Sequence, residues 1–299
     1  MDVTINECHI KKQHKSRFTL RSQIIEILSY FFQSTMFRKR SLMSDICDNK
    51  RRKLNYGENG MNNVRLKKSK KMPLDSLPTD TVGALSYISS LFPTEKFNNR
   101  LPPIVMRHQI YAFVRCRTDV DKQLNELRKK GEIRLFKLGE KDDQIGVVYT
   151  KDYKNYVDRC CRNSLKVDNF LRNVVEICPD ISYSSSALKQ EYGINEDDII
   201  ELIQQGVLTC RDVGCYWLSI PRVGEFMKTF LYGRRAILQY VRRTKYKEIL
   251  QTELEQRKLP RKALLGILYH IYDIIGSDAV TCVETSTGVV LRLQPELTR

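Results

Sequence analysis

Residues 118–150 read TDVDKQLNELRKKGEIRLFKLGEKDDQIGVVYT, and this stretch decides the fold. Its first half predicts an amphipathic helix over residues 118–130, because apolar side chains recur there at helical spacing. These side chains are Val120, Leu124 and Leu127. Gly131 follows directly, and we expect it to end the helix in a left-handed conformation.

The second half of the stretch predicts a β-hairpin. Residues 133–138 are rich in aliphatic side chains, and residues 145–150 (IGVVYT) are β-branched and aromatic, with a polar turn between them. The order helix, glycine, strand, polar turn and strand is typical of the second half of a winged helix-turn-helix domain.

The same order recurs twice further along the chain. Residues 199–221 read IIELIQQGVLTCRDVGCYWLSIP, with Gly206 after the helix. Residues 271–293 read IYDIIGSDAVTCVETSTGVVLRL, with Gly276 in the same place. We therefore predict an α+β, mostly helical protein with three tandem winged helix-turn-helix domains after a disordered basic segment. The predicted boundaries are 1–75 for the segment and 76–161, 162–221 and 222–299 for the domains.

Apolar periodicity and Pro positions predict the remaining helices. They are expected at 82–92, at 104–114 after Pro102-Pro103, and at 152–161, 167–177, 186–192, 195–205, 226–241, 246–256 and 261–275. Trp217, in the second hairpin, is expected to lie in the core.

The formal net charge of +16 is unevenly distributed. Residues 1–75 contain 17 Lys and Arg against 7 Asp and Glu, and residues 222–262 contain 12 against 4. Residues 76–221 contain 20 of each. The predicted folded part is therefore basic in one place only. A polyanion is the natural partner of such a surface, although a charge run can also be an ordinary solvated face.

The N-terminal segment carries two basic clusters. Residues 44–72 contain too few apolar side chains to form a core, so we expect them to be disordered. We interpret the clusters as a nuclear-import signal that also touches nucleic acid. They consist of Lys50, Arg51, Arg52 and Lys53, and of Lys67, Lys68, Lys70 and Lys71. The apolar stretch at 22–37 is too short to span a bilayer. A separate hypothesis is that translation starts at Met43.

No catalytic or metal-binding set is recognisable. The chain has neither a Gly-rich phosphate loop nor the H-R-D and D-F-G motifs of protein kinases. Its nine cysteines show no metal-ligand spacing, and there are four His residues. We expect no catalytic residue, no metal and no cofactor. His108 and His270, beside apolar residues on predicted helices, are expected to be structural residues with satisfied hydrogen bonds.

The third predicted domain is the main candidate for DNA binding. In winged helices the third helix usually enters the major groove, and free N–H groups at its start favour phosphate. Few polar side chains are left there to read base edges, so we expect backbone binding with little sequence preference. The candidate residues are Arg242, Arg243, Lys245, Lys247, Arg257, Lys258, Arg261 and Lys262.

The other two domains are weaker candidates for DNA binding. The first offers a lesser basic set, which consists of Lys122, Arg128, Lys129, Lys130 and Lys137. The predicted third helix of the second domain, NEDDIIELIQQ at 195–205, is acidic and would repel DNA. We expect this helix to bind protein or simply to pack.

Several blocks, in order, resemble a known family. They are LPPIV at 101–105, DKQLNEL at 121–127 with GEIR at 131–134, GVLTCRD at 206–212, VRRTKYKE at 241–248 and YHIYDIIG at 269–276. From about Leu85 to Leu293 the chain resembles the serine/threonine-protein kinase 19 family, whose fold is not that of a kinase. The family's DNA-contacting positions fall on Arg242, Lys245 and Arg257, and a basic residue also matches Lys258. Arg261 and Lys262 depart from the family pattern and rest on the charge argument alone.

The resemblance also implies a function. It points to a double-stranded DNA-binding, non-catalytic adaptor in the nucleus, associated with chromatin. Its implied partners are RNA polymerase and the proteins of transcription-coupled nucleotide-excision repair. Two alternatives are a divergent serine/threonine protein kinase, which would need an ATP site, and a pure protein-interaction scaffold. The sequence leaves open whether the chain forms a homodimer on DNA.

Overall fold

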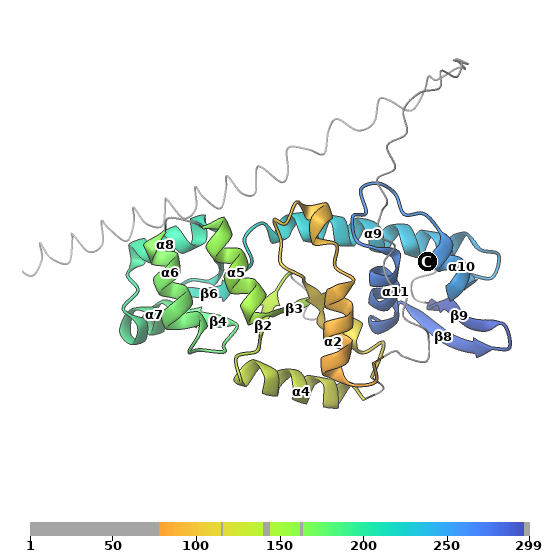
Figure 1. Cartoon of the computed structure of the whole chain (residues 1–299), viewed down its shortest axis with the longest axis horizontal. Coiled ribbons are helices and arrows are strands. Elements are labelled where there is room, and N and C mark those ends of the chain that lie inside the picture. The colour runs from red at the N-terminus through yellow and green to blue at the C-terminus, as the bar shows by residue number, and fades with distance from the viewer. Residues whose placement is uncertain (1–77, 115, 140–143, 162–163, 296–299) are drawn as a thin grey trace, which may run out of the picture. The chain divides into compact units, whose positions relative to one another are not determined.

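The computed structural model describes residues 78–114, 116–139, 144–161 and 164–295 (Figure 1). All of these residues belong to one compact unit, Lys67–Arg299. The predicted basic segment 1–75 and both import clusters lie outside the described residues.

In the described part of the chain, one order of elements recurs three times: helix, short strand, two helices, two strands. The first repeat consists of α2 (Thr81–Ser90), β1 (Val105–Met106), α3 (Arg107–Ile110), α4 (Arg117–Lys129), β2 (Ile133–Lys137) and β3 (Ile145–Tyr149). A 3₁₀ turn, η2 (Thr94–Phe97), precedes β1, and helix α5 (Thr150–Cys160) leads to the second repeat.

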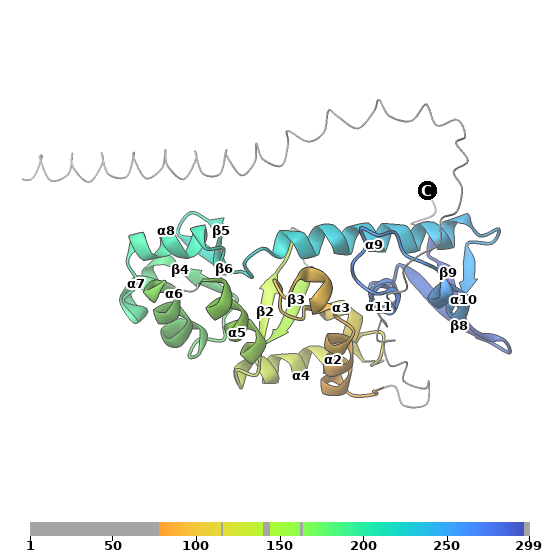
Figure 2. The ribbon, with the colours of Figure 1, turned by 45° about the horizontal axis from the view of Figure 1, so that its top comes forward.

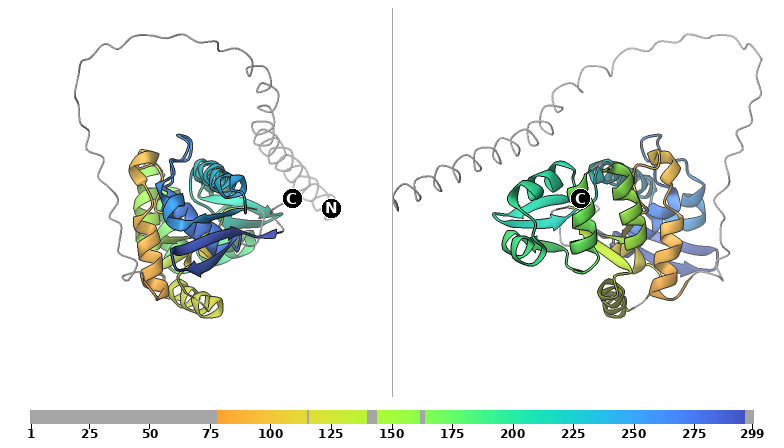
Figure 3. Two further views of the ribbon diagram at one scale, coloured as in Figure 1. Left: turned by 90° about the vertical axis from the view of Figure 1, so that its right-hand side faces the viewer. Right: turned by 60° about the vertical axis from the view of Figure 1, so that its left-hand side comes forward.

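The second repeat begins with α6 (Leu165–Phe170), which continues as a π-helical turn, η3 (Leu171–Val175). It then contains β4 (Ser182–Ser184), α7 (Ser185–Tyr192), α8 (Glu196–Gln204), β5 (Leu208–Asp212) and β6 (Cys215–Leu218). The third repeat consists of α9 (Val223–Arg243), β7 (Glu248–Leu250), α10 (Gln251–Gln256), α11 (Ile267–Gly276), β8 (Val280–Thr285) and β9 (Gly288–Leu293). Figures 2 and 3 show the β8–β9 hairpin extending away from the helices.

Each repeat contains a three-stranded antiparallel sheet in which the last strand lies in the middle. The orders are β1-β3-β2, β4-β6-β5 and β7-β9-β8. In the first sheet, Ile133 lies opposite Tyr149 and Val105 opposite Val147. The sheets and helices together confirm the predicted α+β class.

The long helices and the hairpins match the predictions closely, and two of the three glycines do as well. Gly131 and Gly206 follow α4 and α8 with φ of 75° and 77°, as a left-handed helix end requires. Gly276 differs, because it is the last residue of α11 and the left-handed residue is Asp278, with φ of 55°. A Cβ on Gly276 would lie 1.8 Å from the carbonyl oxygen of His108, so close packing of the backbone requires glycine there.

Three predicted helices are wrong in extent. The one expected at 104–114 is strand β1 followed by the one-turn helix α3, and the one expected at 246–256 begins as strand β7. These strands pair with β3 and β9, far along the chain, so local periodicity does not reveal them. The helix expected at 261–275 begins only at Ile267, because Leu265 is buried in a loop and Gly266 is extended.

Two clusters of buried side chains form the core. The larger combines the first two repeats with Phe226, Phe230, Leu265 and Tyr269 of the third repeat. The smaller lies within the third repeat and includes Ile237, Val241, Ile249, Leu254 and Leu291. Helix α9 therefore contributes to both clusters. Each large side chain buried in this way contributes roughly 1.5–3 kcal/mol, so the third repeat depends on the other two for part of its stability.

Trp217 is an exception to the predicted core. It is half-buried on β6 and belongs to neither cluster. The guanidinium carbon of Arg211, on β5, lies 4.7 Å from the centre of its ring. A cation–π contact on the sheet surface therefore covers this side chain.

Among the described residues, no helix has the length and apolar character needed to cross a membrane.

Candidate nucleic-acid interface

The end of helix α9 presents the first group of basic side chains. Arg242 and Arg243 occupy its last turn, where cations interact favourably with the carbonyl end of the helix. The chain leaves the helix at Thr244, which is extended and whose hydroxyl donates to the carbonyl of Val241 at 2.7 Å. Lys247 then adopts a left-handed conformation with φ of 55°, which turns the chain into β7. Arg242, Arg243, Lys245 and Lys247 are all exposed.

The loop after α10 presents the second group. The hydroxyl of Tyr240, on α9, donates to the carbonyl of Lys258 at 2.7 Å and so holds this loop beside the helix. Arg257, Lys258, Arg261 and Lys262 are exposed. Further along the loop, the Nζ atom of Lys96 in the first repeat donates to the carbonyl of Leu264 at 3.0 Å. The start of this loop is therefore held against α9, the helix that ends in the first basic group, although β7 and α10 separate the two groups in the sequence.

Nearby carboxylates neutralise only part of this charge. Arg257 pairs with Glu253 at 2.6 Å, and Glu248 pairs with Arg292 at 2.8 Å. In the portion of the chain that the structure describes, six of the predicted side chains form no ion pair. They are Arg243, Lys245, Lys247, Lys258, Arg261 and Lys262. We call the eight residues of the two groups the basic surface, which is strongly positive.

The third helix of the third repeat does not have the position expected for groove binding. Seven residues of α11 are buried, and the helix packs on α3 of the first repeat. The side-chain Nε2 of Gln109 donates to the carbonyl of Tyr269 at 2.8 Å, and the hydroxyl of Tyr269 donates to the carbonyl of Ile104 at 2.7 Å. The first repeat therefore covers α11, which does not have the exposed position that is usual for the third helix of a winged helix.

The same finding changes the role of the loop residues. Arg261 and Lys262 were expected at the start of the helix, but α11 starts at Ile267 with Gly266 as its N-cap. These two cations belong to the loop, and the N–H groups of the helix do not supplement them.

The third helices of the first two repeats carry mixed or acidic charge. Helix α4 buries only Val120 and Leu124, and Arg117 at its start forms an exposed ion pair with Asp278 at 2.6 Å. The ammonium group of Lys166, on α6, contacts two carboxylates of α8, Asp198 at 2.9 Å and Glu201 at 3.3 Å. The hydrogen bond from Lys166 lowers the pKa of the Asp198 carboxyl. Glu196 and Asp197 remain exposed, as the acidic sequence predicts.

The two histidines differ in their partners. His108 is buried and its Nε2 lies 2.6 Å from Oδ1 of Asp273, but its Nδ1 has no hydrogen-bond partner among the described residues. His270 is also buried, but neither of its ring nitrogens has a hydrogen-bond partner within the part of the chain that the structure describes. Burial lowers the pKa of His270 to about 4, so the ring is neutral at physiological pH. The expectation of satisfied hydrogen bonds is therefore wrong for His270, and it holds for only one ring nitrogen of His108.

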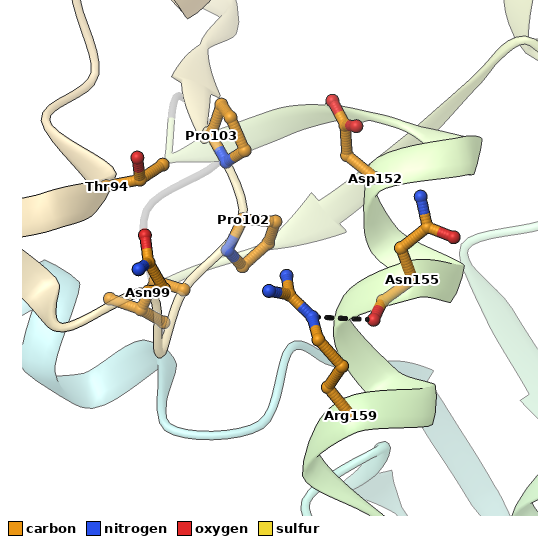
Figure 4. Close-up of a pocket in the computed structure, with 8 residues that line it drawn as sticks. Thr94, Asn99, Pro102, Pro103, Asp152, Asn155 and Arg159 are labelled. Carbon is orange, nitrogen blue, oxygen red and sulfur yellow. Dashed lines mark hydrogen bonds between the residues drawn. The ribbon is translucent and has the colours of Figure 1, made fainter.

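A small cavity lies between α5 and the segment after η2 (Figure 4). Its volume is about 190 Å³, and its lining includes Asn99, Pro102, Asp152 and Arg159. The Nε atom of Arg159 donates to the backbone carbonyl of Asn155 at 3.0 Å. The lining residues contain no pair of nucleophile and base, and the described residues contain no cluster suited to a metal ion.

Two tyrosines that lie beside the basic residues were not singled out by the sequence analysis. Tyr240 holds the loop at Lys258, a contact between segments that no local pattern reveals. Tyr246 is exposed over 72% of its surface and lies between Lys245 and Lys247. The sequence signal that could have identified Tyr246 is its position between two lysines, in a Lys-Tyr-Lys triplet.

The described residues form an α+β protein whose third repeat presents the exposed basic surface. Residues 82–293 match the family described as inactive serine-threonine protein kinase 19, and the chain belongs to this family. The resemblance inferred from the sequence is confirmed.

The chain is also similar to individual curated proteins. It is 41% identical over 224 residues to Winged helix repair factor 1 of Homo sapiens, which covers 74% of this chain and 88% of the human protein. It is 37% identical over 261 residues to Winged helix repair factor 1 of Xenopus laevis, covering 86% and 99%. A protein of Schizosaccharomyces pombe named Serine/threonine-protein kinase mug51 is 27% identical over 118 residues, which covers 38% of this chain and 37% of the yeast protein.

Proposed function

We propose that this chain is a non-catalytic, largely sequence-independent double-stranded DNA-binding adaptor of DNA repair. We further propose that residues 76–161, 162–221 and 222–299 are three winged helix-turn-helix domains, the third being the main DNA-binding unit. The recurring order of elements and the three equivalent sheets support this division. The name of the human and Xenopus relatives, Winged helix repair factor 1, supports both the fold and the repair role.

The observation that carries the proposal is the assembly of the basic surface. The hydrogen bond from Tyr240 to Lys258 holds the loop that carries one exposed basic segment against the helix that ends in the other. Six of the eight cations form no ion pair among the described residues, so phosphates can approach them without competition from a carboxylate. Exposed Lys and Arg side chains bind the phosphate backbone of DNA and release its counterions.

The burial of α11 supports binding that is independent of sequence. A helix that packs against the first repeat cannot place side chains against base edges in the major groove. The cations lie at a helix end and on a loop, where they contact phosphates rather than bases.

The finer role follows from the family resemblance. We place the protein in the nucleus, on chromatin, in transcription-coupled nucleotide-excision repair beside stalled RNA polymerase. In this role the third repeat binds the duplex and the first two repeats remain available for repair proteins. The exposed Glu196 and Asp197 on α8 support a protein partner there, because acidic side chains repel DNA.

The test is the binding of duplex DNA by the full chain over a series of salt concentrations. Lys245→Glu/Lys258→Glu is compared with the matched control Lys151→Glu/Lys189→Glu, which changes the net charge equally at exposed lysines outside the basic surface. We expect the first variant to bind about tenfold or more weakly for every sequence, with a flatter salt dependence. The control should bind nearly as the natural chain does.

Two results would contradict the proposal. Equal losses in both double variants would mean that only net charge matters and that the basic surface has no special role. If the natural chain showed no salt-sensitive affinity, the function would be that of a protein-interaction scaffold. Thermal stabilisation by ATP and Mg²⁺ would instead favour the kinase alternative.

A further inference from the structure

An exposed aromatic ring lies between two lysines of the basic surface. Tyr246 is 72% exposed in the turn between α9 and β7, while the other exposed tyrosine of the described chain, Tyr232, is 41% exposed. Lys245 and Lys247 flank it, and the Nζ atom of Lys245 lies 5.2 Å from the centre of the Tyr246 ring. The exposed ring and the neighbouring lysines would both be satisfied by a single ligand that has a flat aromatic face and a negative charge.

Hydrogen bonds on both sides fix the turn that carries this ring. The N–H of Lys247 donates to the carbonyl of Thr244 at 3.1 Å, and the N–H of Leu293 on β9 donates to the carbonyl of Lys247 at 3.0 Å. The left-handed conformation of Lys247 completes the turn. The ring therefore projects from an ordered backbone, which lowers the entropy that binding would have to overcome.

Nucleobases are the groups that combine a flat aromatic face with a nearby phosphate. In an intact duplex, neighbouring base pairs cover these faces, and a side chain beside the backbone cannot reach them. Unpaired bases at a bubble or at a junction of single and double strands expose them. Aromatic stacking on such a base contributes roughly 1–3 kcal/mol and tolerates any base.

We infer that Tyr246 stacks on an unpaired base, and that the basic surface therefore prefers duplex DNA with a bubble or single-strand junction to fully paired DNA. This inference rests on the proposed function and specifies its substrate. The lysines bind the phosphates of the duplex arm, and Tyr246 occupies the point where pairing ends. The preference is for DNA structure and not for sequence, because the ring reads no base edge.

The experiment compares two DNAs of equal length, one fully paired and one with a short central run of mismatches. The full chain, Tyr246→Ala, Tyr246→Phe and the control Tyr232→Ala are titrated against each by fluorescence anisotropy. We expect the natural chain to favour the mismatched DNA, and Tyr246→Ala to lose roughly five- to 150-fold in affinity for it. Tyr246→Phe retains the ring and should keep the preference, and Tyr232→Ala should leave it unchanged.

Two further readouts separate stacking from other effects. The salt dependence of Tyr246→Ala should equal that of the natural chain, because no charge is removed. A fluorescent base analogue placed among the mismatches should be quenched by the natural chain and by Tyr246→Phe, but not by Tyr246→Ala.

The outcomes distinguish this inference from the proposed function. Equal affinity of the natural chain for both DNAs, with the loss in Lys245→Glu/Lys258→Glu intact, would overturn the stacking of Tyr246 and leave DNA binding in place. Equal losses of Tyr246→Ala on both DNAs would overturn it as well. Absence of salt-sensitive binding to either DNA would overturn the proposed function itself.

Discussion

The Nε2 atom of His108 lies 2.6 Å from Oδ1 of Asp273, and this contact joins α3 of the first repeat to α11 of the third. Both side chains are buried. The Nη1 atom of Arg234, on α9, lies 3.5 Å from the same carboxylate oxygen, and its Nη2 donates to the hydroxyl of Ser277 at 2.5 Å. A buried polar network therefore fixes α11 between the two repeats.

His108→Ala should destabilise the protein strongly, because it leaves the Asp273 carboxylate buried without its histidine. Removal of one partner from such a pair costs about 3–5 kcal/mol, and Arg234 should keep the value at the lower end. Chemical denaturation measures the change. The control is Arg117→Ala, which breaks the exposed pair with Asp278 and should cost at most about 1 kcal/mol. Similar losses in both variants would contradict the structural role of the buried contact.

Gly276→Ala should destabilise the contact between α11 and α3. The added Cβ would lie 1.8 Å from the carbonyl oxygen of His108, so the two helices must separate, at about 1–3 kcal/mol or more. Gly131→Ala is the matched control, since nothing lies within 4 Å of its Cβ position and only the left-handed φ opposes the change. Melting temperatures should fall further for Gly276→Ala, and the reverse order would show that the helices are not packed as described.

Arg134→Met should weaken the contact between the first and second repeats. The buried Arg134 guanidinium donates to the carbonyl of Cys178 at 2.6 Å and to that of Val175, at the end of the first helix of the second repeat. Burial lowers the pKa of Arg134, so these carbonyls hold a partly desolvated cation. Each carbonyl that the substitution leaves unpaired lowers the free energy of unfolding by about 1–3 kcal/mol, and urea denaturation measures this loss. Arg172→Met, at an exposed position in the second repeat, should change the unfolding free energy little.

The stability of the protein should fall as the pH drops from about 6.5 towards 4, in part because of His270. Burial lowers the pKa of His270 from 6.5 to about 4. The charge of Asp273 raises this pKa and the charge of Arg234 lowers it. Below pH 6.5 the unfolded chain therefore binds a proton that the folded protein excludes. The loss amounts to at most about 3 kcal/mol and is complete near the folded pKa.

Denaturation of the natural chain and of His270→Leu across this range measures the contribution of His270. The variant should lose part of the pH dependence, because it has no imidazole to protonate. An unchanged slope would show that other groups account for the whole pH dependence.

Glu253→Gln should strengthen DNA binding if the proposed function is correct. Glu253 pairs with Arg257 at 2.6 Å, so its removal releases one cation of the basic surface and removes a negative charge. A gain of roughly three- to tenfold at low salt, with a steeper salt dependence, is expected from one additional phosphate contact. Glu225→Gln, at the other end of α9, has the same charge change and should leave the affinity nearly unchanged.

The sequence predicted those parts of the fold that depend on local periodicity. Helix 118–130, the three hairpins and the left-handed Gly131 follow from residues close together in the chain, and the structure confirms them. The short strands β1 and β7 were not predicted, because two or three residues pair with strands far along the chain.

The candidate site was predicted unevenly for a related reason. Charge counting located the basic residues of the third repeat, since charge is a property of composition. It could not show that α11 is covered by α3, because Tyr269 and Asp273 look like the apolar and capping residues of any helix. The loop contact of Tyr240 with Lys258 likewise depends on tertiary structure alone.

Helix α9 inserts Phe226 and Phe230 into one cluster of buried side chains and Ile237 and Val241 into another. In a fragment that begins at the start of this helix, Phe226, Phe230 and Tyr269 would be exposed to solvent, because the first two repeats would no longer cover them. The third repeat is therefore not an independent folding unit that could be moved to another protein. Attempts to graft residues 222–299 onto another protein should yield aggregation unless the first repeat is transferred with them.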